Sequence, residues 1–211
     1  MDETMQTDHE AIIIANGEFP SDEESRQLIR QSPLTVCCDG AAEEYIKHYG
    51  LPDAVVGDCD SIPPATARLC AKILHHISEQ DTNDLSKSIR HLHAQGIRKV
   101  IILGATGKRE DHTIGNISLL IDYMHMGMQV KMHTPCGNII PCEGTHTFHC
   151  QKGQQISIFN FGAHNLSAEG LRYPLSDFHT WWQGTLNEAT TTQFTIHATG
   201  DYLVYLAREE E

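Results

Sequence analysis

The chain has 211 residues, of which 40% are apolar and 20% are charged, the balance of an ordinary globular protein that can bury a core. Fifteen basic and 28 acidic residues give a net charge of −13, which disfavours nucleic acid and anionic membrane surfaces as partners. The longest apolar runs are far shorter than the roughly 18 residues that span a membrane, and the N-terminal segment MDETMQTDHE lacks the pattern of a secretory signal. The seven cysteines form no obvious disulfide framework, so we expect a cytoplasmic protein.

Short apolar runs alternate with helical patterns over the first 130 residues. The predicted strands are Ala11–Ala15, Thr35–Cys38, Ala54–Val56, Ile73–Ile77, Lys99–Leu103 and Gln129–His133. The predicted helices are Glu23–Arg30, Ala42–Tyr49, Ala65–Ala71, Asp84–Gln95 and Thr113–Met126. Strands that are apolar throughout are covered on both faces, so this half predicts a parallel α/β sheet with helices on each side.

The pattern changes after about residue 133, where helical periodicity disappears and glycine-marked turns become frequent. The predicted strands of this half are His146–Cys150, Gln155–Phe159, Gln193–Ala198 and Tyr202–Leu206. Phe194 and Ile196 alternate with polar residues, as in a half-buried antiparallel strand. The sequence therefore predicts two domains, an α/β domain over residues 1–132 and a small antiparallel β-sandwich over residues 133–211, packed closely together.

Carboxylates follow four of the predicted parallel strands. The segments that carry them are Asp39-Gly40, Gly57-Asp58-Cys59-Asp60-Ser61, Gln80-Asp81-Thr82-Asn83-Asp84 and Gly104-Ala105-Thr106-Gly107-Lys108-Arg109-Glu110-Asp111-His112. Ligands of open parallel sheets bind beyond the carboxyl ends of the strands, so we expect these loops to form one site. An aspartate at a strand end can also simply form a turn or cap a helix, but four acidic loops with interleaved basic residues favour a site.

The spacing of the charged residues indicates a divalent cation and phosphate. Asp58 and Asp60 are separated by one residue, which in an extended segment points both carboxylates the same way. Together with a third carboxylate they suit Mg²⁺. Asp84 and Lys87 lie one helical turn apart, and Lys87 with Arg109 could hold phosphate oxygens. The segment Gly104–Arg109 resembles the end of a P-loop but lacks its spacing and its Ser/Thr, so an ordinary P-loop is excluded.

Three charged segments in this order resemble the thiamine pyrophosphokinase family. They are DGAAEEYIKHYGLPDAVVGDCDSIP, QDTNDLSKSI and ILGATGKREDHTIGNISLL, and the later SAEGLRYPL and GTLNE resemble motifs of the family's sandwich domain. The resemblance covers about residues 11–206. It implies an N-terminal α/β domain, a C-terminal β-sandwich, Mg²⁺ and ATP, and a homodimer with two sites at the subunit interface. It also implies the activity, which is ATP-dependent transfer of diphosphate to thiamine to give thiamine diphosphate and AMP.

The resemblance assigns roles to ten residues. The metal ligands it implies are Asp58, Asp60 and Asp84. The residues it places around ATP are Asp39, Gln80, Lys87, Arg109 and Asp111, and the thiamine contacts are Ser167 and Tyr173. Asp58, Asp60, Asp84, Lys87 and Arg109 then form the catalytic set. Glu43 stands where the family has Asn, and its role is left open because a carboxylate cannot donate a hydrogen bond to phosphate.

Two alternatives compete with this interpretation. One is a different Mg²⁺-dependent nucleotide phosphotransferase or phosphohydrolase. The other is a zinc-binding protein, because six potential ligands lie within 18 residues: His133, Cys136, Cys142, His146, His149 and Cys150. The absence of a C-x-x-C motif and the alternation of side chains along a strand disfavour the zinc site.

Overall fold

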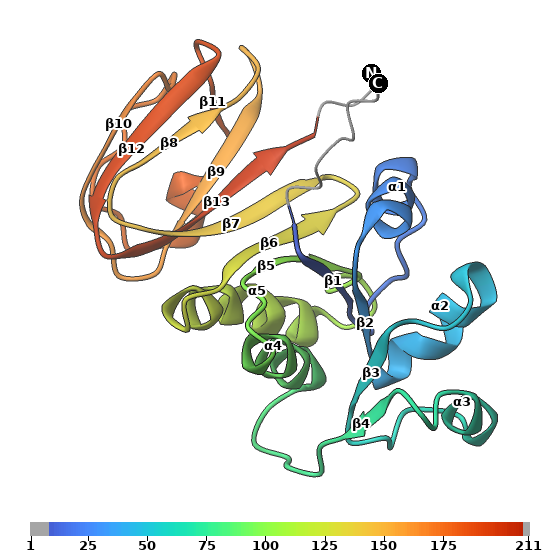
Figure 1. Cartoon of the computed structure of the whole chain (residues 1–211). Coiled ribbons are helices and arrows are strands. Elements are labelled where there is room, and N and C mark those ends of the chain that lie inside the picture. Colours follow the sequence, from blue (N-terminus) through green and yellow to red (C-terminus); the bar gives the residue numbers. More distant parts are fainter. Residues whose placement is uncertain (1–8, 209–211) are drawn as a thin grey trace.

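The computed structural model describes residues 9–208. The expectation about a secretory signal concerns residues 1–8, which lie outside the described residues, as do Glu209, Glu210 and Glu211. The N-terminal half forms a parallel α/β sheet and the C-terminal half adds antiparallel strands (Figure 1). The predicted fold class is thus confirmed. None of the described helices is long and apolar enough to cross a membrane.

The parallel part of the sheet has the order β6-β5-β1-β2-β3-β4. Its strands are β1 (Ala11–Ile14), β2 (Thr35–Cys38), β3 (Ala54–Gly57), β4 (Leu74–His76), β5 (Lys99–Leu103) and β6 (Gln129–Thr134). Four strands inside the sheet, β1, β2, β3 and β5, are almost wholly buried, as their largely apolar sequences predict. β4 is shorter than predicted and largely exposed because it is the edge strand and pairs with β3 alone.

Helices cover both faces of the parallel sheet (Figure 1). They are α1 (Glu23–Gln31), α2 (Ala42–Tyr49), α3 (Pro64–Leu69), α4 (Asp84–Ala94) and α5 (Glu110–His125). Alternate residues of β1 enter opposite cores: Ala11 and Ile13 pack with α4 and α5, whereas Ile12 and Ile14 pack with α1 and α2. α5 begins one turn before the predicted start, with Glu110 and Asp111 at the positive end of the helix dipole.

The same sheet continues into the C-terminal half through β6, which pairs with β7 in the antiparallel sense. The added strands follow the order β7-β13-β9-β11, and a second sheet of order β10-β12-β8 packs against them. Their bounds are β7 (Gly137–Glu143), β8 (His146–His149), β9 (Gln155–Asn160), β10 (His164–Glu169), β11 (Asn187–Glu188), β12 (Gln193–Thr199) and β13 (Asp201–Ala207), with 3-10 turns η1 (Asp39–Ala41) and η2 (Trp181–Gly184). The predicted domain boundary between residues 132 and 133 falls within β6, and it stays a prediction.

The two halves are also joined at the end of β13. Arg208 lies 3.2 Å from Asp22 and 2.7 Å from Glu24 at the start of α1, and its Nη2 donates to His133 Nε2 at 2.9 Å. Asp22 caps α1 and accepts hydrogen bonds from the Ser25 backbone and hydroxyl. Burial raises the pKa of Asp22, but the hydrogen bonds from Ser25 and Arg208 and the charge of Arg208 outweigh it and bring the pKa down to about 2.

We expect Asp22→Ala to lower the free energy of unfolding at pH 7 by about 1 kcal/mol, because α1 loses its cap. The folded-state pKa lies below the ordinary value, so the stabilisation is complete above about pH 4 and is lost as pH falls towards 2. Denaturant unfolding from pH 7 to pH 2 should show the two proteins converging in acid. Asp81→Ala, which changes an exposed carboxylate without a side-chain partner in the described structure, serves as the control; a gap that stays constant with pH would contradict the role assigned to Asp22.

Candidate functional site

The predicted loops meet at the carboxyl ends of the parallel strands and line a cavity of about 390 Å³. Of the ten predicted site residues, five line this cavity: Asp58, Gln80, Asp84, Lys87 and Arg109. Asp39 and Asp60 belong to the carboxylate cluster beside it, and Asp111 is bonded to Arg109. Ser167 and Tyr173 do not line it, because they lie on the sandwich half of the chain.

Three carboxylates converge next to the cavity. One oxygen each from Asp39, Asp58 and Asp60 lies within 4.8 Å of the others. Cys59 between the two later aspartates has a φ of 68°, which bends the chain so that Asp58 and Asp60 remain together. β3 ends in Gly57, where a Cβ atom would lie 2.8 Å from Asp39 Cβ. A glycine at this position therefore lets Asp39 lie against the end of the strand.

Asp39 has the chemistry of a metal ligand. Its side chain is fully buried at the end of β2, and neither carboxylate oxygen has a hydrogen-bond partner. Burial and the charge of Asp84 raise the pKa of Asp39 to about 6, although the backbone amides of Gly40 and Cys59 lie near enough to offset part of this increase. A buried, unsatisfied carboxylate beside two others is a set of hard oxygen donors, which fits Mg²⁺. The sequence placed Asp39 at the opening of the ATP site; the geometry adds it to the candidate metal ligands.

Lys87 connects this cluster to Asp84. Its side chain is only 2% exposed, and its Nζ lies 3.1 Å from Asp84 and 3.5 Å from Asp58. Burial lowers the pKa of Lys87, but the hydrogen bond and charge of Asp84 and the charge of Asp58 outweigh it and raise the pKa. Asp84 is not part of the three-carboxylate cluster in the described structure, and its role as a metal ligand stays a prediction.

Hydrogen bonds fix the neighbouring polar groups. Gln80 Nε2 donates to Asp58 Oδ2 at 3.0 Å, as expected for a residue of the same site. The hydrogen bond from the Asp60 backbone is the largest influence on Asp58, and with Gln80 and Lys87 it lowers the pKa of that carboxyl to about 2 against the effect of burial. Arg109 is exposed and forms a two-pronged ion pair with Asp111, with Nη2 2.6 Å from Oδ2. That pair leaves the guanidinium at the rim of the cavity.

Several uncharged or unpredicted residues complete the cavity. Its lining also includes residues for which the sequence predicts no role: Asn16, Gly17, Ser61, Asn83, Lys108, His112 and Asn116. Asn83 caps α4 and donates to Asn116, which in turn donates to the Ala105 carbonyl, so the loops before α4 and α5 are tied together. Asn16 and Gly17 follow β1, so the principle that ligands bind beyond the carboxyl ends of parallel strands could have identified them.

The predicted thiamine contacts lie on the sandwich. Ser167 is exposed on β10, and the Tyr173 side chain is 53% exposed beyond that strand. Asn187 holds the backbone of Tyr173 from both sides, since its Oδ1 accepts from Tyr173 N at 3.0 Å and its Nδ2 donates to Tyr173 O at 2.8 Å. The segments SAEGLRYPL and GTLNE therefore meet through this pair, which presents the tyrosine ring at the surface. Glu43 lies on α2 and faces Lys47 at 3.7 Å instead of lining the cavity.

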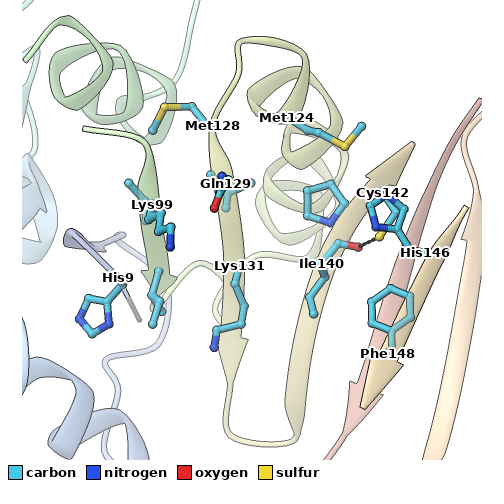
Figure 2. A pocket seen from close by; sticks show the side chains of 14 residues that line it. His9, Lys99, Met124, Met128, Gln129, Lys131, Ile140, Cys142, His146 and Phe148 are labelled. Atoms are coloured by element: carbon cyan, nitrogen blue, oxygen red, sulfur yellow. Dashed lines mark hydrogen bonds between the residues drawn. The ribbon is translucent and has the colours of Figure 1, made fainter. Parts of the chain in front are cut away.

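A second cavity, of about 400 Å³, lies over β5, β6 and β7, between the two halves of the chain (Figure 2). Lys99, Lys131, His9 and His146 border it together with Phe148. It contains none of the predicted site residues, so the carboxylate-lined cavity at the strand ends remains the candidate site.

The six His and Cys residues of the zinc alternative do not form a metal site in the described structure. The groups with ligand spacing there are the three aspartates and His125 with Glu143 and Asp201. The described cysteines are all free, and Cys142 is buried in the sandwich core. The zinc alternative is not favoured.

The fold and the cavity define an α/β protein with a carboxylate- and lysine-lined cavity at its strand ends and an attached sandwich. The model of the thiamin pyrophosphokinase catalytic domain matches residues 25–132, and that of the thiamin pyrophosphokinase substrate-binding domain matches residues 137–205. The chain therefore belongs to the thiamin pyrophosphokinase family, as the sequence motifs indicated.

Individual relatives agree with this assignment. Thiamine pyrophosphokinase 1 of rice is 25% identical over 90% of this chain and 83% of its own, and thiamine pyrophosphokinase of Bacillus subtilis is 27% identical over 72% of this chain and 73% of its own. Among solved structures, thiamine pyrophosphokinase from Bacillus subtilis has a TM-score of 0.76 at 20% identity over 96% of this chain and 100% of its own. That from Candida albicans has a TM-score of 0.77 at 19% identity over 95% and 89%. Because these identities are low, the likeness to the solved structures supports the fold of this chain alone.

Proposed function

We propose that the protein transfers diphosphate from ATP to thiamine. The hydroxyl oxygen of thiamine loses its proton and forms a bond to the β-phosphorus of ATP, the bond from that phosphorus to the oxygen bridging the α-phosphate breaks, and AMP leaves with that oxygen. The observation that carries the proposal is the meeting of three carboxylates with the cation Lys87 at the strand ends of a thiamin pyrophosphokinase fold.

The residues present fit Mg²⁺, and Asp39, Asp58 and Asp60 would hold it, with Asp84 as the further ligand that the family resemblance implies. When bound, the ion screens the phosphates from these carboxylates and polarises the reacting phosphate oxygens. Lys87 is fixed in place by Asp58 and Asp84 and supplies a buried positive charge to the polyphosphate. Arg109 is exposed at the rim and can turn from Asp111 to phosphate when ATP enters.

Thiamine needs an aromatic surface for its cationic ring, and the carboxylate cavity has no aromatic ring other than that of His112 among its described lining residues. Tyr173 offers such a surface and Ser167 a polar contact, but both lie on the sandwich half and outside that cavity. We infer that two copies of the chain form a homodimer in which the sandwich of one subunit completes the site of the other. The free cysteines suit the reducing cytoplasm, where we place the enzyme.

Identification of the reaction products tests this function. Incubation with Mg²⁺, ATP and thiamine should give AMP and thiamine diphosphate in equal amounts, because the proposed attack is on the β-phosphorus. Chromatography with phosphorus NMR identifies both products, and omission of thiamine is the control for simple ATP hydrolysis. ADP with thiamine monophosphate, or AMP formed equally fast without thiamine, would exclude the proposed reaction in favour of another Mg²⁺-dependent nucleotide enzyme.

A further inference from the structure

Lys108 has a backbone conformation that lysine rarely adopts. It lies between Gly107 and Arg109 in the loop that follows β5, and its φ is 59°. Side chains with a Cβ atom are strained at such angles, whereas glycine is not. The loop is otherwise held firmly, since Gly17 N donates to Gly104 O and Glu18 N donates to Thr106 O. The chain therefore places a long cationic side chain where a glycine would be less strained.

Lys108 differs from the other cations of the cavity in its partners. Lys87 is paired with Asp58 and Asp84, and Arg109 is paired with Asp111. Lys108 Nζ instead donates to two uncharged oxygens, the carbonyl and the side-chain Oδ1 of Asn16, each at 3.2 Å. Among the described residues Lys108 forms no ion pair: the Glu18 carboxylate lies beside the neighbouring Gly107, but the contacts of the Lys108 ammonium are with the two neutral oxygens of Asn16.

Asn16 brings this ammonium close to the metal-binding end of the cavity. The Asn16 side chain packs against Gly40, since a Cβ atom on that glycine would lie 2.1 Å from Asn16 Nδ2. Gly40 directly follows Asp39, which belongs to the carboxylate cluster. Asn16 and Lys108 both line the cavity. The Lys108 ammonium, which has neutral partners alone, therefore lies on the side of the cavity where the phosphates would meet the carboxylate cluster.

We propose that Lys108 is a polyphosphate-binding residue, which exchanges its two neutral contacts with Asn16 for oxygens of the β- and γ-phosphates of ATP. This rests on the proposed function, in which those two phosphates are the group transferred. They carry most of the negative charge of ATP, and an ammonium gains more from a charged oxygen than from a carbonyl. Because Lys108 is exposed, its side chain can make this exchange without repacking the core.

The test uses Lys108→Gly, which removes the charge and also relaxes the backbone. Calorimetry with Mg²⁺ and α,β-methylene ATP, whose bond between the α- and β-phosphates cannot be cleaved, measures binding without turnover. We expect the dissociation constant of this analogue to rise about tenfold while that of AMP stays unchanged, and the Tm of the variant to equal or exceed that of the wild type. Lys108→Arg should retain tight binding of the analogue, because the charge is kept.

Lys152→Ala is the control for loss of one positive charge, since Lys152 is exposed in a turn of the sandwich half and outside the cavity. Unchanged analogue binding by Lys108→Gly, or equal weakening for the analogue and AMP, would overturn the assignment of Lys108 while leaving the proposed activity intact. A wild-type protein that does not bind the analogue at all would overturn both.

Discussion

Asp60→Asn is expected to lower kcat/KM about a hundredfold at limiting Mg²⁺ while leaving the fold intact. Asp60 is exposed, and the Ser61 hydroxyl donates to its Oδ1 at 2.8 Å. The substitution therefore removes little packing. It does remove one of three clustered negative charges, so the affinity for a divalent cation falls and the mutual repulsion of the carboxylates is relieved.

These two effects have opposite signs and can be measured separately. The activity should recover partly as Mg²⁺ is raised, whereas the Tm without Mg²⁺ should equal or exceed that of the wild type. Asp81→Asn is the matched control, because it makes the same change at an exposed aspartate next to Gln80 but outside the cluster. A normal rate for Asp60→Asn at limiting Mg²⁺ would mean that the Asp58–Asp60 segment is only a turn.

The parallel half of the fold could be predicted from the sequence because its strands are buried on both faces. In β5, for example, Val100–Leu103 is a continuous apolar run that polar residues do not interrupt. The sequence of the antiparallel half predicts its strands less clearly, and β7, β10 and the two-residue β11 are not among the predicted strands. β7 contains Asn138 and Pro141, and β10 has the largely polar sequence HNLSAE, so neither has a clear alternation. At Pro141, β7 pairs with β13, whereas the pairing of β7 with β6 has already ended at Ile139. A proline is tolerated where one side of the strand is unpaired.

The charged residues of the site could be predicted for a related reason: topology alone brings the carboxyl ends of parallel strands to one edge. What the sequence could not give is the set of contacts within that edge. The membership of Asp39 in the carboxylate cluster depends on its burial against Gly57, and the role of Asn16 depends on its distance from Lys108. Both are tertiary contacts between segments far apart in the chain. An aspartate or an asparagine in the sequence does not by itself predict such a contact.

Tyr173→Ala is expected to raise the KM for thiamine more than about tenfold and to change the KM for ATP little. The tyrosine ring is half exposed and its backbone is held by Asn187, and the Arg172 guanidinium lies 5.8 Å from the ring centroid, so the ring can receive a flat cation on the face that Arg172 does not cover. Loss of such a contact costs about 1–2 kcal/mol, or roughly 5- to 30-fold in affinity, and the expected change lies in the upper part of this range. Trp182→Ala is the matched control, because that ring is also exposed on the sandwich half but has no predicted role. Equal increases in the KM for both substrates would contradict a thiamine-specific contact.

The same variant can decide whether the pocket is shared between subunits. In the proposed homodimer, Asp60 of one subunit and Tyr173 of the other serve the same site. Mixing Asp60→Asn with Tyr173→Ala subunits, after unfolding and refolding together, should create hybrid dimers with one site that carries both native residues. Random pairing makes about half of the dimers hybrid, so about a quarter of all sites should be intact, and activity at limiting thiamine should rise to roughly that fraction of the wild-type value. If both residues instead served a site within one chain, every subunit would carry a defect and mixing would restore nothing. Activity that stays at the average of the two separate variants would therefore exclude the shared pocket.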